Sequence, residues 1–170
     1  DVIPSPMNAI PPDTHNSRVQ CACQVGSSLW IVDRTNCITI VDISTGEVAK
    51  RLSSDTAFAP LDRRNGRMVI GDAMSPDKLK TKSDHITCCV AARNESEIWM
   101  GGNDGKIHVF DALRQKRVAE LKKHVGAIQC LHYDPSSHLV FSGGNDFKIV
   151  SWRVVHDPPS TKASKGSPSG

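Results

Sequence analysis

The chain has 170 residues, 38% of them hydrophobic, and a formal net charge of +3 at pH 7. A chain of this length can bury one core, and so small a charge does not predict nucleic acid or anionic lipid as the partner. No apolar run approaches the roughly 18 residues of a membrane-spanning helix, and the first thirty residues lack the order of a signal peptide.

The first predicted unit, residues 15–52, follows a proline-rich segment, residues 1–14. Apolar and polar residues alternate in four short runs of this unit, VQCACQV, SLWIVDR, CITIVDIS and EVAKRL. Such alternation predicts strands. Residues 53–84 then include the polar stretches LDRRNGR and SPDKLKTKSD, which predict a long inserted loop rather than another unit.

Two further units repeat each other. The phrase GGNDGKIHVFD begins at residue 101 and GGNDFKIVSWR at residue 143, and the same offset aligns Cys88 with Cys130. A period of about 40 to 45 residues predicts a stack of equivalent supersecondary units. Residues 85–122 predict four strands. Residues 123–155 predict three, because the prolines that follow cannot donate to a sheet, and residues 156–170 predict a flexible linker.

Each GGND phrase is predicted to be the turn between the second and third strands of its unit. Its glycines and asparagine would permit a positive φ, and its aspartate would accept hydrogen bonds from nearby backbone N–H groups. Neither copy has the paired carboxylates of a calcium loop or the Lys-Ser/Thr ending of a phosphate loop. The predicted turn residues are Gly101, Gly102 and Asp104 in one copy, and Gly143, Gly144 and Asp146 in the other.

The last unit, KHVGAIQCLHYDPSSHLVFSGGNDFKIVSWRV, resembles a WD repeat (tryptophan–aspartate repeat) of β-propellers. In that family a His precedes the first strand, and SGS-x-D-x-x-I-x-x-W spans the second and third. The resemblance covers residues 15–155 and implies a structural tetrad, since a buried Asp and an indole N–H both need partners. The four tetrad residues would be His124, Ser142, Asp146 and Trp152.

The other two tetrads are predicted not to form, because most of their residue types are replaced. The places of His, Ser, Asp and Trp hold Lys82, Met100, Asp104 and Phe110 in the second unit, and His15, Ile31, Thr35 and Val41 in the first.

Six cysteines raise the question of zinc or redox chemistry. No Cys-x-x-Cys occurs, and Cys21, Cys88 and Cys130 hold equivalent positions on first strands, which favours small apolar residues in a tight inner layer over a metal site. Unpaired cysteines suit a reducing compartment such as the cytoplasm. The remaining histidines are predicted to be solvated strand residues; they are His85, His108, His132 and His138.

Basic residues cluster as LDRRNGR at 61–67 and as RQKRVAELKKH at 114–124. Only eight residues of the chain are aromatic, so a platform for stacking bases is missing. A solvated loop and an outer strand therefore explain these clusters better than nucleic-acid binding does, and phosphoinositide head groups remain a minor alternative.

Together these features predict an all-β partial β-propeller of three four-stranded blades, the third lacking its outer strand, within a larger propeller. By fold analogy we expect a scaffold that binds protein partners through loops, without catalytic residues, metal, cofactor or small-molecule substrate. The alternative is a regulatory domain of a larger enzyme, such as an inositol polyphosphate phosphatase or an exchange factor. The candidate partner-binding residues, which could also be simple turn residues, are Asn103 and Asn145, with Lys106 and Lys148 as weaker choices.

Overall fold

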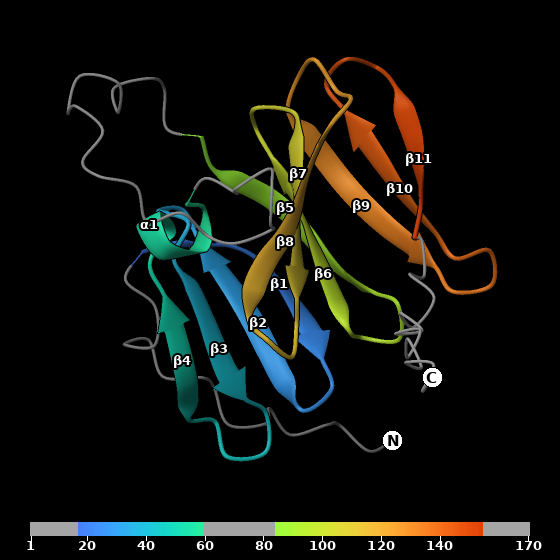
Figure 1. The fold of residues 1–170 in the computed structure, drawn as a ribbon. Helices are drawn as coiled ribbons and strands as arrows, with labels where there is room; N and C mark the ends of the chain where they lie inside the picture. Colours follow the sequence, from blue (N-terminus) through green and yellow to red (C-terminus); the bar gives the residue numbers. More distant parts are fainter. Residues whose placement is uncertain (1–16, 60–83, 155–170) are drawn as a thin grey trace, which may run out of the picture.

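The computed structural model describes residues 17–59 and 84–154, which form three antiparallel sheets (Figure 1). Blade 1 contains β1 (Val19–Val25), β2 (Ser28–Asp33), β3 (Ile38–Asp42) and β4 (Val48–Leu52). Blade 2 contains β5 (Ile86–Ala92), β6 (Glu97–Gly102), β7 (Lys106–Asp111) and β8 (Lys116–Lys122). Blade 3 contains β9 (Ile128–Asp134), β10 (Leu139–Gly144) and β11 (Ile149–Arg153). The predicted all-β fold of three blades, the last with three strands, is confirmed.

The segment predicted as one long loop, residues 53–84, begins with the short helix α1 (Ser54–Ala57). The helix forms because the Ser53 side chain caps it, accepting a hydrogen bond from the backbone N–H of Thr56 at 3.4 Å. Residues 60–83 of that prediction, and the predictions for residues 1–14, His15, Lys82 and residues 156–170, fall outside the described residues. Among the described residues, no helix is long and apolar enough to cross a membrane.

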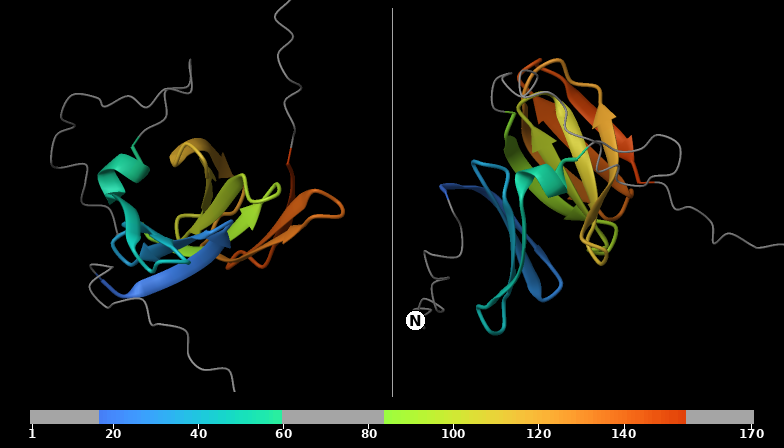
Figure 2. Two further views of the ribbon diagram at one scale, coloured as in Figure 1. Left: turned by 90° about the horizontal axis from the view of Figure 1, so that it is seen from below. Right: turned by 60° about the vertical axis from the view of Figure 1, so that its left-hand side comes forward.

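The three blades lie one beside the next, and their first strands adjoin (Figure 2). Strand side chains alternate between the two faces of a sheet, so both faces of blade 2 are covered. Met100 and Phe110 belong to the core shared with blade 1, whereas Trp99 and Ile107 belong to the core shared with blade 3. The hydrophobic core is thus divided into two layers, one at each junction between blades.

The face of blade 3 that points away from blade 2 is not covered by another sheet within the described residues. Ile107 of blade 2 is fully buried, but Ile149, its repeat equivalent, is 80% exposed. Cys88 is partly buried, whereas its equivalent Cys130 is exposed. The prediction of an inner-layer position was therefore wrong for Cys130, because no further sheet lies against this face within the described residues.

We predicted that the GGND phrases contain glycine because it permits a positive φ, and this reason was also wrong. They end β6 and β10, and neither they nor the asparagines have a positive φ. A positive φ occurs instead at Gly105 (+78°) and at the equivalent Phe147 (+59°).

These positions require glycine because atoms of other residues lie too close for a Cβ atom. A Cβ atom on Gly101 would lie 2.7 Å from Cγ2 of Ile128 in the next blade. A Cβ atom on Gly144 would lie 2.7 Å from Nδ1 of His124. The first glycine lets two blades meet, and the second makes room for the side chains that organise the turn.

Candidate interaction site on the turn face

Side chains of blade 3 join in one hydrogen-bonded chain, and they are the four predicted from the repeat pattern. The Trp152 indole N–H donates to the Ser142 hydroxyl oxygen at 2.8 Å. That oxygen lies 2.8 Å from His124 Nε2, and His124 Nδ1 lies 2.9 Å from Asp146 Oδ1. An Nδ1–H tautomer satisfies every partner, with Ser142 donating to Nε2.

Serine, histidine and aspartate in this order match the connectivity of a nucleophilic triad, but their surroundings favour a structural role. Ser142 and His124 are buried, at 0% and 1% exposure. Trp152 also occupies a lone pair of the hydroxyl that a nucleophile would use. Asp146 in addition accepts hydrogen bonds from the backbone N–H groups of Val125 and Lys148. The hydrogen bond from His124, together with these two, lowers the pKa of Asp146 to about 2.

In blades 1 and 2 the equivalent positions are largely apolar. Met100 and Phe110 are fully buried in blade 2. In blade 1 the turn is organised by Asp33, whose Oδ1 accepts hydrogen bonds from the backbone N–H groups of Thr35 and Cys37. Sequence analysis missed Asp33, although an aspartate two residues before a threonine is a recognised turn signal.

The turns after β2, β6 and β10 lie against the crossovers that lead into β5 and β9, and we call this side of the blades the turn face. The Asn36 side chain joins blade 1 to blade 2, because its Oδ1 accepts the backbone N–H of Ile86 at 2.9 Å and its amide donates to the backbone oxygen of Asp84 at 2.6 Å. The turn face is therefore tied together across the boundary between the blades.

Two of the four predicted partner-binding residues already have partners within the chain. Asn103 Oδ1 accepts the backbone N–H of His85 at 2.9 Å, and its amide nitrogen lies 3.1 Å from the His85 ring nitrogen Nδ1. Lys106 makes ion pairs with Asp104 at 3.3 Å and with Glu120 at 3.5 Å. Asn145 and Lys148, in blade 3, are exposed.

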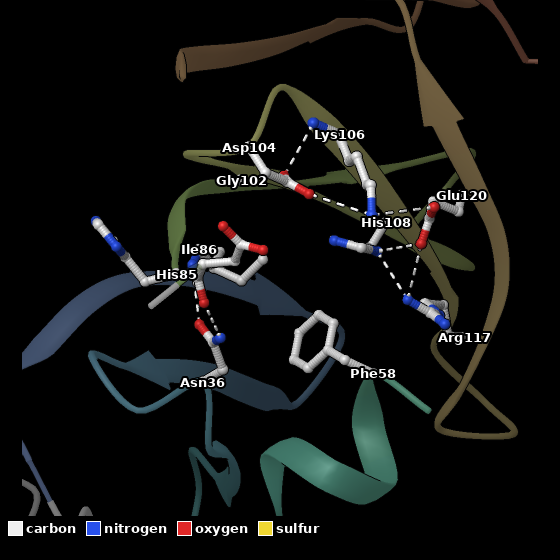
Figure 3. A pocket seen from close by; sticks show the side chains of 11 residues that line it. Asn36, Phe58, His85, Ile86, Gly102, Asp104, Lys106, His108, Arg117 and Glu120 are labelled. Atoms are coloured by element: carbon white, nitrogen blue, oxygen red, sulfur yellow. Dashed lines mark hydrogen bonds and ion pairs between the residues drawn. The ribbon is translucent and has the colours of Figure 1, made fainter. Parts of the chain in front are cut away.

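A cavity of about 180 Å³ opens between blades 1 and 2 on the turn face (Figure 3). We call it the interblade pocket. Its lining comes from the turn after β2, the end of α1, the crossover into β5, and strands β7 and β8. The lining residues are Asn36, Phe58, Asp84, His85, Ile86, Gly102, Asp104, Lys106, His108, Arg117 and Glu120.

Arg117 organises one wall of the interblade pocket. Its side chain is only 3% exposed, and it donates to His108 Nδ1 at 3.0 Å and to Glu120 at 3.3 Å. It also donates to the backbone oxygen of Ala59, and its guanidinium carbon lies 6.0 Å from the centre of the Phe58 ring. This residue thus holds the end of α1 against blade 2.

His108 is buried beside Arg117, so its prediction as a solvated residue was wrong. Burial and the adjacent guanidinium lower the pKa of His108 to about 4, which leaves the ring neutral at pH 7. Phe58 packs edge-on against the ring, with 5.0 Å between centroids. The predictions for His132 and His138 agree with the structure, since both are exposed, but His85 is partly buried.

Charges around the interblade pocket are mostly paired. Burial would lower the pKa of Lys106, but the carboxylates of Glu120 and Asp104 outweigh this effect and raise it. Asp84 is exposed at the mouth, and among residues 17–59 and 84–154 it makes no ion pair. The pocket therefore offers one carboxylate beside a neutral hydrogen-bonding wall and an aromatic ring.

Metal coordination is not supported by the arrangement of side chains. Within the part of the chain that the structure describes, no group of three His, Cys, Asp or Glu residues is placed to hold a metal ion. All six cysteines are free thiols.

Residues 115–153 match the family described as WD domain, G-beta repeat. The matched stretch extends from β8 to β11, so it combines the outer strand of blade 2 with the three strands of blade 3. The sequence repeat is thus displaced by one strand from the structural blade. One complete sequence repeat therefore supplies three strands to blade 3, and its first strand, β8, belongs to blade 2.

The chain is similar to cilia- and flagella-associated protein 52 of Homo sapiens, with 24% identity over 149 residues that cover 88% of this chain. It is 25% identical to pre-mRNA-processing factor 19 of Bos taurus over 125 residues, or 65% of this chain. These matches span only 23% and 25% of the two relatives. A crystal structure of RRP9 WD40 repeats has the same fold, with a TM-score of 0.61 and 15% identity over 82% of this chain and 36% of that one.

Proposed function

We propose that this chain, whose sheets are blades of a WD-repeat propeller, is a protein-interaction module that receives a partner's side chain in the interblade pocket. Residues from both blades build the pocket, and an internal network of hydrogen bonds and ion pairs holds its walls. A wall that is already ordered loses little conformational entropy when a partner binds. That preformed wall is the observation that carries the proposal.

The size of the interblade pocket favours a side chain over a small molecule. Its volume of about 180 Å³ lies below the roughly 300–1,000 Å³ that is typical of small-molecule sites. Ser142 and His124 of the blade 3 tetrad are buried, which favours a role in packing rather than catalysis. The proposal therefore assigns no reaction, cofactor or metal to these blades.

The charges at the mouth favour a lysine or arginine side chain. Asp84 supplies a carboxylate without an ion pair among the described residues, while Asp104 and Glu120 share Lys106. A cationic group entering beside Asp84 would be attracted, and it would not have to displace an existing pair. We place this interaction in a reducing compartment such as the cytoplasm, which suits six free thiols.

Site-specific photo-crosslinking tests the proposal. A benzophenone amino acid at Arg34, which is exposed in the turn that carries Asn36, should crosslink to protein partners in cells. The same group at Asn94, in the turn between β5 and β6, is the control. Asp84→Lys should abolish the crosslinks formed from position 34. Equal capture from both positions, or capture that persists in Asp84→Lys, would exclude this pocket as the interaction site.

A further inference from the structure

A second cavity, of about 150 Å³, lies between blades 1 and 2, and Arg117 lines both it and the interblade pocket. We call this second cavity the basic groove. Strand β4, helix α1, strands β7 and β8 and the turn between these two strands form it. Its lining includes Lys50, Leu52, Ala57, Phe110, Arg114 and Lys116.

The floor of the basic groove is apolar and fixed. Leu52, Ala57 and Phe110 are 7%, 5% and 0% exposed, and all three belong to the core between blades 1 and 2. Phe58 packs edge-on against Phe110, with 5.7 Å between ring centroids. Leu52 and Ala57 keep a small exposed apolar surface above the buried Phe110, and a cavity of about 150 Å³ can accept one apolar side chain there.

Every charged residue that the structure places at the rim of the basic groove is positive. Lys50 on β4 and Lys116 on β8 are exposed, Arg114 is 77% exposed, and no acidic residue among those that the structure describes lines the cavity. Arg114 is partly neutralised by Asp111 at 3.1 Å, but the two lysines make no ion pair within the described residues. The rim therefore attracts carboxylates that approach from solvent.

We infer that the basic groove binds an acidic segment of a partner protein, with one apolar side chain on the floor and carboxylates beside Lys50 and Lys116. The apolar floor distinguishes this partner from nucleic acid, whose bases require aromatic stacking surfaces. Among the described residues, Phe110 is the one aromatic residue in the lining, and it is fully buried. This binding does not depend on the interblade pocket, because within residues 17–59 and 84–154 the two cavities share only Arg117.

The two lysines come from separate regions of the sequence, which explains why the groove was not predicted. Lys116 belongs to the basic stretch 114–124, which looks like an ordinary solvated strand when it is considered alone. Lys50 lies in the outer strand of blade 1, more than sixty residues earlier in the chain. Folding brings the two together around an apolar floor, and this combination points to a protein ligand.

A peptide titration with the full chain tests the inference. The probe is a fluorescein-labelled peptide of glutamates around one central leucine, compared with peptides in which glutamine replaces every glutamate or serine replaces the leucine. Fluorescence anisotropy should show that each replacement weakens binding. The Lys50→Glu, Lys116→Glu double variant should weaken binding of the acidic peptide by about tenfold or more.

Two control variants test whether the loss of peptide binding is specific to the basic groove. Lys122→Glu with Arg153→Glu makes the same change in net charge at exposed positions outside the groove, and it should leave binding unchanged. The milder Lys50→Gln, Lys116→Gln variant removes the two charges without reversing them, and it should lose an intermediate amount of affinity for the acidic peptide. This variant tests the same surface if the charge-reversed chain does not fold. Equal effects of both double reversals, or equal binding of the glutamine peptide, would overturn the inference. Displacement of the labelled acidic peptide by a single-stranded oligonucleotide of equal charge, at the same concentration, would also overturn the inference.

Discussion

The indole nitrogen of Trp152 lies 2.8 Å from the hydroxyl oxygen of Ser142, and the hydroxyl in turn lies 2.8 Å from His124 Nε2. Ser142 is fully buried, so no water can replace a lost partner without rearrangement. One hydroxyl therefore satisfies two neighbouring side chains, and the two hydrogen bonds should reinforce each other.

Ser142→Ala should destabilise the chain by about 1 to 3 kcal/mol, because it leaves the indole N–H and a histidine nitrogen without their partner. Trp152→Phe should cost on the order of 1 kcal/mol through the lost donor. In urea unfolding the double variant should show a coupling of about 1 kcal/mol, since both changes damage the same network. Ser137→Ala, at an exposed position, should instead be additive with Trp152→Phe. Additivity of the first pair would show that the hydrogen bond contributes nothing to stability.

Gly101 and Gly143 occupy the same place in their repeats but meet different neighbours. A Cβ atom on Gly101 would approach Cγ2 of Ile128 to 2.7 Å, whereas one on Gly143 would meet, among the described residues, only the Cys130 sulfur, at 2.8 Å. Gly101→Ala should cost about 1 to 3 kcal/mol by overpacking the junction between blades. Gly143→Ala should cost less, because the exposed thiol can turn aside. Thermal melts of the two variants check the order, and a larger loss in Gly143→Ala would contradict this account.

The strands could be predicted from the sequence because alternating apolar runs and the 42-residue offset agree with each other. Burial was harder to predict. His108 lies in the run IHVF, where residues on both faces of β7 are buried, so alternation cannot distinguish a solvated histidine from a covered one. Its partner Arg117 lies on the next strand, and only the pairing of β7 with β8 brings them together.

The two cavities could not be predicted for a related reason. Their linings combine residues from blade 1, the end of α1 and blade 2, which no single repeat contains. The role of glycine in GGND also depends on a neighbouring side chain, Ile128, rather than on the turn itself. Repeat patterns therefore predicted what each blade contains, and contacts between blades determined the candidate sites.

The open face of blade 3 should cause the 170-residue chain to self-associate. Ile149 is 80% exposed and Phe147 is fully exposed, so burial of this face should be favourable. Sedimentation velocity should show oligomers whose fraction rises with concentration. Ile149→Lys should shift the chain towards the monomer, whereas Val118→Lys, on β8, should not. A compact wild-type monomer with a cooperative melt would contradict the prediction.

The stability of the chain should fall as pH decreases from 6.5 towards 4 because of His108. Burial and the nearby Arg117 lower the pKa of this histidine to about 4 in the folded state, against an ordinary value of 6.5. Between these values the unfolded chain binds a proton that the folded chain does not, so protonation favours unfolding. The stabilisation is complete above pH 6.5, and its loss by pH 5 should be about 2 kcal/mol.

His108→Gln removes this titration while leaving a side chain whose oxygen can accept from Arg117. The variant should be less stable than wild type at pH 7, and the difference between the two should narrow as pH falls to 5. His132→Gln, at an exposed position, should keep the wild-type slope. Urea unfolding at half-unit steps between pH 7 and pH 5 measures both slopes. If His108→Gln and wild type lost stability in parallel, His108 would not be held neutral by the fold, and the wall of the interblade pocket would be more accessible to solvent than its geometry indicates.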